Sequence, residues 1–104
     1  MKEISVKELK KKIDNQDEFQ LIDVREEFEY EVSNLNGENI PLGGLLLELD
    51  RIATDKPVII HCRSGARSAA AILQLETQGF SKLYNLKGGI LAWAQEIDPN
   101  MPVY

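Results

Sequence analysis

Short apolar runs alternate with helical patterns along this chain, and this alternation limits the fold more than any other feature of the sequence. Mainly apolar runs of strand length, bounded by turn signals, predict buried β-strands over residues 19–24, 57–61 and 82–86. A fourth, very short strand is expected at 39–40, just before Pro41. Strands that alternate with helices pair in parallel, so the sequence predicts an α/β fold with helices covering a parallel sheet.

Helix signals occupy the segments between these strands. Ser5 and Glu8 have the spacing of a capping box, which predicts a helix as far as Ile13 with Val6, Leu9 and Ile13 on its apolar side. The other helices are expected after Asp23 as far as Tyr30, over the leucine-rich residues 45–52, over 68–78 before Gly79, and from Gly88 and Gly89 onward with Trp93 in the core.

Length and composition exclude several classes of protein. A chain of 104 residues has room for one hydrophobic core, so we expect one domain over residues 1–104. The net charge of −5 argues against nucleic-acid binding, which needs a basic surface. No apolar stretch approaches the roughly 20 residues of a membrane span, and the first residues do not form a signal peptide. A single cysteine suits a reducing compartment, so we expect a cytoplasmic protein that contacts no membrane.

Cys62 is that cysteine, and its position favours a reactive thiol. It lies between the strand predicted at 57–61 and the helix that follows, where backbone N–H groups and the helix dipole stabilise an anion. Arg63 and Arg67 add positive charge. Lowering the pKa of a thiol from about 8.5 to about 7 raises its thiolate population roughly tenfold at neutral pH. A buried structural cysteine is the alternative, but the charged residues that follow Cys62 argue against it.

Several motifs together resemble one protein family. Residues 62–68, C-R-S-G-A-R-S, resemble the active-site loop of rhodanese-like sulfurtransferases. Segments that resemble other family motifs occur in the family's order: L-I-D-V-R at 21–25, I-P-L-G at 40–43 and G-G-I-L-A-W at 88–93. The chain departs from the family at 33–40, where many members carry Gly-His-Ile. Its closing residues, 90–104, are similar to the C-terminal rhodanese domain of enzymes that adenylate and thiolate ubiquitin-like sulfur carriers.

This resemblance implies a fold, an activity and a set of site residues. The fold is a central, mostly parallel five-stranded sheet with helices on both faces. The activity is transfer of sulfane sulfur from a small anionic donor, such as thiosulfate, or from a persulfide, to a thiol or a ubiquitin-like sulfur carrier, with no metal or cofactor. Cys62 is the nucleophile, and Asp23 and Arg25 support the loop. The persulfide-binding residues are Arg63, Ser64, Gly65, Ala66, Arg67 and Ser68, of which the two arginines are expected to attract the donor.

Two other functions remain open. A His-Cys loop with an arginine ahead of a helix also occurs in Cys-dependent phosphatases and arsenate reductases, but those enzymes place one residue more between cysteine and arginine than the four between Cys62 and Arg67. A shorter loop suits one sulfur atom better than a tetrahedral oxyanion. A non-catalytic binding module is the other alternative. His61 either packs in the core, as its place at a strand end favours, or acts as the base for Cys62.

Overall fold

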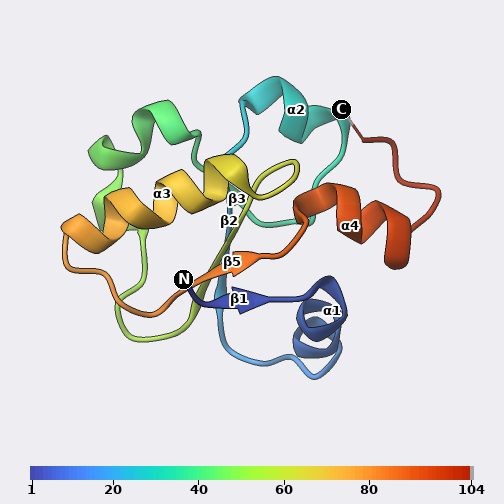
Figure 1. Cartoon of the computed structure of the whole chain (residues 1–104), viewed down its shortest axis with the longest axis horizontal. Helices are drawn as coiled ribbons and strands as arrows, with labels where there is room; N and C mark the ends of the chain where they lie inside the picture. Colours follow the sequence, from blue (N-terminus) through green and yellow to red (C-terminus); the bar gives the residue numbers. More distant parts are fainter. Residues whose placement is uncertain (104) are drawn as a thin grey trace.

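Residues 1–103 are described by the computed structural model, in which a five-stranded sheet is flanked by helices (Figure 1). Tyr104, the last residue of the closing segment, lies outside the described residues. The elements in chain order are β1 (Glu3–Ile4), α1 (Val6–Asp14), β2 (Gln20–Asp23), α2 (Glu27–Val32), β3 (Glu38–Asn39), the 3-10 helices η1 (Leu42–Leu47) and η2 (Leu49–Arg51), β4 (Val58–His61), α3 (Ala66–Thr77), β5 (Leu83–Leu86) and α4 (Gly89–Glu96).

The sheet is parallel throughout, with the strand order β1-β5-β4-β2-β3. The α/β class and the five-stranded sheet are therefore confirmed. In the register of β2 and β4, Asp23 lies beside His61. Because parallel strands end at the same edge of a sheet, this register brings the residues after β2 close to the loop after β4. Cys62 therefore has neighbours from several parts of the chain.

Helices cover both faces of the sheet, as predicted (Figure 1). Val58 and Ile60 on β4 face a core that also holds Ile72 and Leu75 of α3. Ile59, between them in sequence, faces the opposite core, which is formed with residues of α1 and α4. This alternation is the period-two pattern of a strand buried on both faces, and it explains why the three residues before His61 are all apolar. Within residues 1–103, no helix is long and apolar enough to cross a membrane.

The starts of α1 and α3 lie at or close to the positions that the sequence predicts. The Ser5 hydroxyl accepts the Glu8 N–H at 3.1 Å and the Glu8 carboxylate accepts the Ser5 N–H at 3.0 Å, which confirms the capping box. Ile13, predicted on the apolar side of α1, is 39% exposed. The helix α3 begins at Ala66, two residues earlier than predicted, because the loop after Cys62 turns directly into it.

The prediction of one core-packing helix over 45–52 is wrong. The segment forms the short 3-10 helices η1 and η2 instead, with a break at Glu48. Leu45 is fully buried, whereas Leu46 and Leu47 are 48% and 88% exposed. Gly43 and Gly44 disfavour an α-helix in the first turn, and consecutive leucines do not lie on one face of any helix.

Candidate active site

Cys62 lies directly after β4, at the bottom of a loop that leads into α3. Only 1% of its surface is exposed. The Gly65 N–H donates a hydrogen bond to the Cys62 sulfur at 3.1 Å, and the Ser68 hydroxyl lies 3.4 Å from the same sulfur. The loop therefore curls around the sulfur atom and presents the Gly65 N–H to it, as the strand-to-helix position predicts.

The start of α4 fixes the loop from outside. The Ile90 N–H donates to the Cys62 carbonyl at 3.0 Å, and the Leu91 N–H donates to the Arg63 carbonyl at 3.1 Å. These bonds fix the backbone of Cys62 and Arg63 against the start of α4. Gly89 makes the approach possible, because a Cβ there would lie 2.5 Å from the Arg63 carbonyl oxygen and 2.6 Å from that of Cys62. The Gly88–Gly89 pair, expected only to open a helix, thus also shapes the loop.

The hydrogen bonds at the sulfur favour the thiolate. Burial acts to raise the pKa of Cys62, but the hydroxyl of Ser68 and the backbone N–H groups of Ser68, Gly65 and Ser64 together outweigh burial and lower the pKa below that of an ordinary thiol. The thiol is therefore both shielded from solvent and more acidic than usual.

Ser68 belongs to a small polar network that reaches β5. Its hydroxyl lies 2.6 Å from the Asn85 side-chain oxygen and 3.1 Å from the Gly65 carbonyl, and the Asn85 amide donates to the same carbonyl at 3.2 Å. Ser68 is fully buried and Asn85 is 6% exposed. Sequence reasoning missed Asn85, although a polar residue inside the apolar run 82–86 is a signal of this kind of role.

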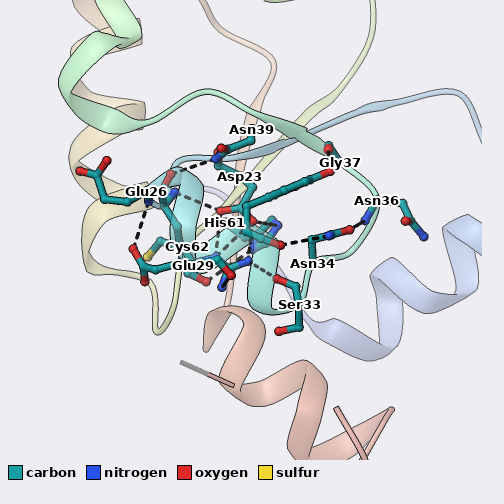
Figure 2. Close-up of polar contacts among 12 residues, drawn as sticks. Asp23, Glu26, Glu29, Ser33, Asn34, Asn36, Gly37, Asn39, His61 and Cys62 are labelled. Atoms are coloured by element: carbon teal, nitrogen blue, oxygen red, sulfur yellow. Dashed lines mark hydrogen bonds and ion pairs between the residues drawn. The ribbon is translucent and has the colours of Figure 1, made fainter. Parts of the chain in front are cut away.

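Arg67 is paired with a residue that sequence reasoning did not single out. Its guanidinium donates to both carboxylate oxygens of Glu29, at 2.6 and 2.9 Å. The Glu29 carboxylate also accepts the Glu26 N–H at 3.0 Å (Figure 2). The Arg67 hydrogen bonds hold the pKa of Glu29 below its usual value, although burial opposes this. The charge of Arg67 is therefore compensated, whereas the sequence predicts that it attracts a donor.

Asp23 and Arg25 form a buried ion pair beneath α2. The Arg25 guanidinium lies 2.8 Å from the Asp23 carboxylate, and both side chains are fully buried. Arg25 also donates to the backbone carbonyls of Ser33 at 2.8 Å and Glu29 at 3.4 Å. The pair thus anchors α2, the helix that carries Glu29, to β2.

His61 is fully buried at the end of β4, and its ring lies near Asp23 (Figure 2). Its Nε2 atom is 3.7 Å from the Asp23 carboxylate, and its Nδ1 atom is 3.4 Å from the Cys62 carbonyl oxygen. Burial lowers the pKa of His61, and the Asp23 carboxylate only partly offsets this. The ring therefore packs as a neutral group, and the Cys62 sulfur has the Gly65 N–H and the Ser68 hydroxyl within hydrogen-bonding distance.

The remaining predicted site residues lie on the surface of the loop. Arg63, Ser64 and Ala66 are exposed, while Gly65 is half-buried and has a φ of 117°, in the left-handed region that favours glycine. The loop thus has an exposed outer rim and a buried inner side that carries the sulfur. Within residues 1–103 there is no group of three or more His, Cys, Asp or Glu residues that could hold a metal ion.

Comparison with known proteins identifies the class. The family model described as "Rhodanese-like domain" matches residues 5–96, so the chain belongs to the rhodanese-like family. A solved structure, the rhodanese-like domain protein of Staphylococcus aureus, superposes with a TM-score of 0.85 at 30% identity and covers 100% of this chain and 99% of that one. The predicted family membership is therefore confirmed by both sequence and structure.

Two curated relatives carry the name of an activity. A protein of Allochromatium vinosum named "Sulfurtransferase" is 33% identical over 94 residues, which cover 89% of this chain and 88% of that protein. The "Probable adenylyltransferase/sulfurtransferase MoeZ" of Mycobacterium tuberculosis is 32% identical over 104 residues, 97% of this chain. The chain spans 26% of the length of MoeZ. These relatives support sulfur transfer in general.

Proposed function

We propose that this chain is a thiosulfate-class sulfurtransferase in which Cys62 carries the transferred sulfur as a persulfide. One observation carries the proposal: the Cys62 sulfur is buried yet accepts the Gly65 N–H at 3.1 Å and lies 3.4 Å from the Ser68 hydroxyl. An anionic sulfur is stabilised by such donors in a water-poor site, as an oxyanion is in an oxyanion hole. The lowered pKa of Cys62 supports the same role.

The reaction is a pair of displacements at sulfur. The Cys62 thiolate attacks the outer sulfur of the donor, forming a new S–S bond as the donor's S–S bond breaks. The leaving group, which is sulfite when thiosulfate is the donor, departs with the bonding electron pair. A thiolate or another nucleophile then attacks the outer sulfur of the persulfide, and the Cys62 thiolate is released. The proton balance is zero in both steps when the reacting groups are anions.

The shape of the loop favours sulfur over phosphate. Because only 1% of Cys62 is exposed, little room is left at its sulfur for an incoming group. A terminal sulfane sulfur suits that space, whereas a tetrahedral phosphate needs donors around three oxygens. The loop residues from Arg63 to Ser68 surround the persulfide, and the Asp23–Arg25 pair supports them through α2.

The acceptor is a thiol or a ubiquitin-like sulfur-carrier protein. The resemblance of residues 90–104 to the C-terminal domain of adenylating and thiolating enzymes supports the second choice, and the relative named as an adenylyltransferase/sulfurtransferase is consistent with it. We place the chain in the cytoplasm, where a single unpaired cysteine stays reduced.

Mass spectrometry of the intact protein tests the proposal. Incubation with thiosulfate is expected to add the mass of one sulfur atom, and cyanide is expected to remove it. Cys62→Ser is the control, and it is expected to keep the fold and to lose both the added mass and thiosulfate:cyanide transfer. Transfer that persists undiminished in Cys62→Ser refutes the assignment of Cys62 as the nucleophile.

A further inference from the structure

The ion pair between Arg67 and Glu29 changes the charge of the loop. Two short, parallel hydrogen bonds join the two terminal nitrogens of the guanidinium to the two carboxylate oxygens, a bidentate arrangement that is stronger than a single hydrogen bond. The Glu29 side chain is 6% exposed and that of Arg67 35% exposed. A pair of this kind is screened less by water and salt than one on the open surface. The cation closest to the helix end of the loop therefore has a fixed counterion.

Glu29 has little freedom to leave this position. It lies in the first turn of α2, where its carboxylate also accepts the Glu26 N–H. The backbone of the same helix is tied to β2 by Arg25, which donates to the carbonyls of Glu29 and Ser33. Arg67 would have to break two hydrogen bonds to turn toward a donor, and it would leave a nearly buried carboxylate without its partner.

Arg67 nevertheless acts on the reacting sulfur electrostatically. Its hydrogen bonds to Glu29 raise the pKa of Arg67, and the Cys62 thiolate adds to that effect. Arg67 lies in the first turn of α3, directly after the loop that carries the thiolate, so its charge is part of the same site. A donor that approaches Cys62 meets the field of both members of the pair, and the negative charge of Glu29 cancels much of the attraction exerted by Arg67.

We propose that Glu29 is a positioning residue that sets donor selectivity: by neutralising Arg67 it reduces the advantage that a dianion such as thiosulfate would otherwise have over sulfane-sulfur donors of lower negative charge. The inference rests on the proposed sulfur transfer and narrows its donor class. When Glu29 cancels the charge of Arg67, each donor loses electrostatic attraction to the loop in proportion to its own charge. A dianion therefore loses twice as much attraction as a monoanion, and a neutral donor loses none.

Two matched donors isolate this effect. Thiosulfate is a dianion and methanethiosulfonate is a monoanion, and each delivers one sulfane sulfur to the Cys62 thiolate, with sulfite or methanesulfinate leaving with the bonding electron pair. The ratio of kcat/KM for thiosulfate to that for methanethiosulfonate is measured at low ionic strength, since salt weakens the effect. The two donors differ in intrinsic reactivity, but this difference cancels when the ratio is compared between variants. The effect of the Arg63 charge cancels as well, because Arg63 is the same in every variant.

Glu29→Gln removes the negative charge and keeps a hydrogen-bond acceptor for Arg67. We expect it to raise the ratio about tenfold, mainly through a lower KM for thiosulfate, because one uncompensated charge then faces one additional charge on the donor. The double variant Glu29→Gln/Arg67→Gln is uncharged, like the native pair, and is expected to restore the native ratio. Glu29→Ala replaces Glu29→Gln if the latter does not fold, which circular dichroism decides.

Each outcome has one meaning. A ratio that rises in the single variant and returns in the double variant supports the inference. A ratio that stays at the native value while both donors still load Cys62 overturns the inference and leaves the proposed function standing. A ratio that rises equally in both variants also overturns it, because local structure and not charge would then be the cause. Failure of every donor to form a persulfide on native Cys62 instead refutes the proposed function.

Discussion

Replacing Gly89 by alanine is expected to damage the fold and the active-site loop together. Gly89 has a φ of 59°, and its Cβ would lie 2.5 Å from the Arg63 carbonyl oxygen and 2.6 Å from the Cys62 carbonyl oxygen. Both contacts are shorter than van der Waals distance, and both involve backbone atoms that cannot swing aside. The loop or the start of α4 must therefore move.

Alanine substitutions at two other glycines separate the causes of the expected loss of stability. Gly79 has a φ of 94°, but no atom lies within 4 Å of the position that a Cβ would take, so Gly79→Ala carries only the conformational cost, about 1 to 2 kcal/mol. Gly43 has open space and no positive φ, so Gly43→Ala should change stability by less than about 1 kcal/mol. Gly89→Ala adds overpacking and weakened bonds from Ile90 and Leu91, for a total of about 3 to 6 kcal/mol.

Urea unfolding and persulfide formation measure the two effects. The free energy of unfolding is expected to fall in the order Gly43→Ala, Gly79→Ala, Gly89→Ala. Only Gly89→Ala is expected to lower kcat/KM for thiosulfate, by about tenfold or more, since a displaced loop no longer aims the Gly65 N–H at the sulfur. The reasoning fails if Gly89→Ala is no less stable than Gly79→Ala, or if it transfers sulfur at the native rate.

Three further predictions concern the loop and its histidine. Ser68→Ala removes the hydroxyl 3.4 Å from the Cys62 sulfur, so the pH profile of persulfide formation should shift upward and the rate near pH 7 should fall about tenfold; an unchanged profile contradicts this. One glycine inserted after Gly65 gives the phosphatase spacing and should favour oxyanion binding over persulfide formation; Cys62-dependent aryl phosphate hydrolysis by the native chain would instead support a phosphatase. His61 is the sole histidine, and its lowered pKa means that the unfolded chain takes up a proton that the native chain refuses, so the free energy of unfolding should fall below about pH 6.5, by up to about 1.4 kcal/mol per pH unit. His61→Gln should flatten that slope in urea unfolding measured across this pH range, and a flat native profile contradicts the assignment.

Features with a local cause were predictable from the sequence. The capping box of Ser5 and Glu8 depends on residues three apart, and the structure forms it as expected. The strand at 57–61 is apolar at nearly every position because both of its faces are buried, and this is visible without knowing what covers them. The place of Cys62 between a strand and a helix follows from the same local signals, and so does the prediction of a more acidic thiol.

Elements that depend on distant partners were not predictable in this way. The strand β1 has only two residues, Glu3 and Ile4, and exists because it pairs with Asn85 and Leu86 on β5. Its own sequence carries no strand signal, so only the family resemblance implied a fifth strand.

The charge of the active-site loop is the clearest case in which local sequence misleads. Residues 62–68 contain two arginines and no acid, which predicts a cationic cradle for an anion. The partner of Arg67 is 38 residues away in the sequence, on a different helix. Several other glutamates lie near it in the sequence, and nothing in the local sequence distinguishes them. Only the fold identifies Glu29, because Arg25 ties the backbone of α2 to β2 and the Glu29 side chain is the buried glutamate of that helix. If Glu29 acts as we propose, donor preference at such a loop depends on the sequence of α2 as well as on the residues that surround the sulfur.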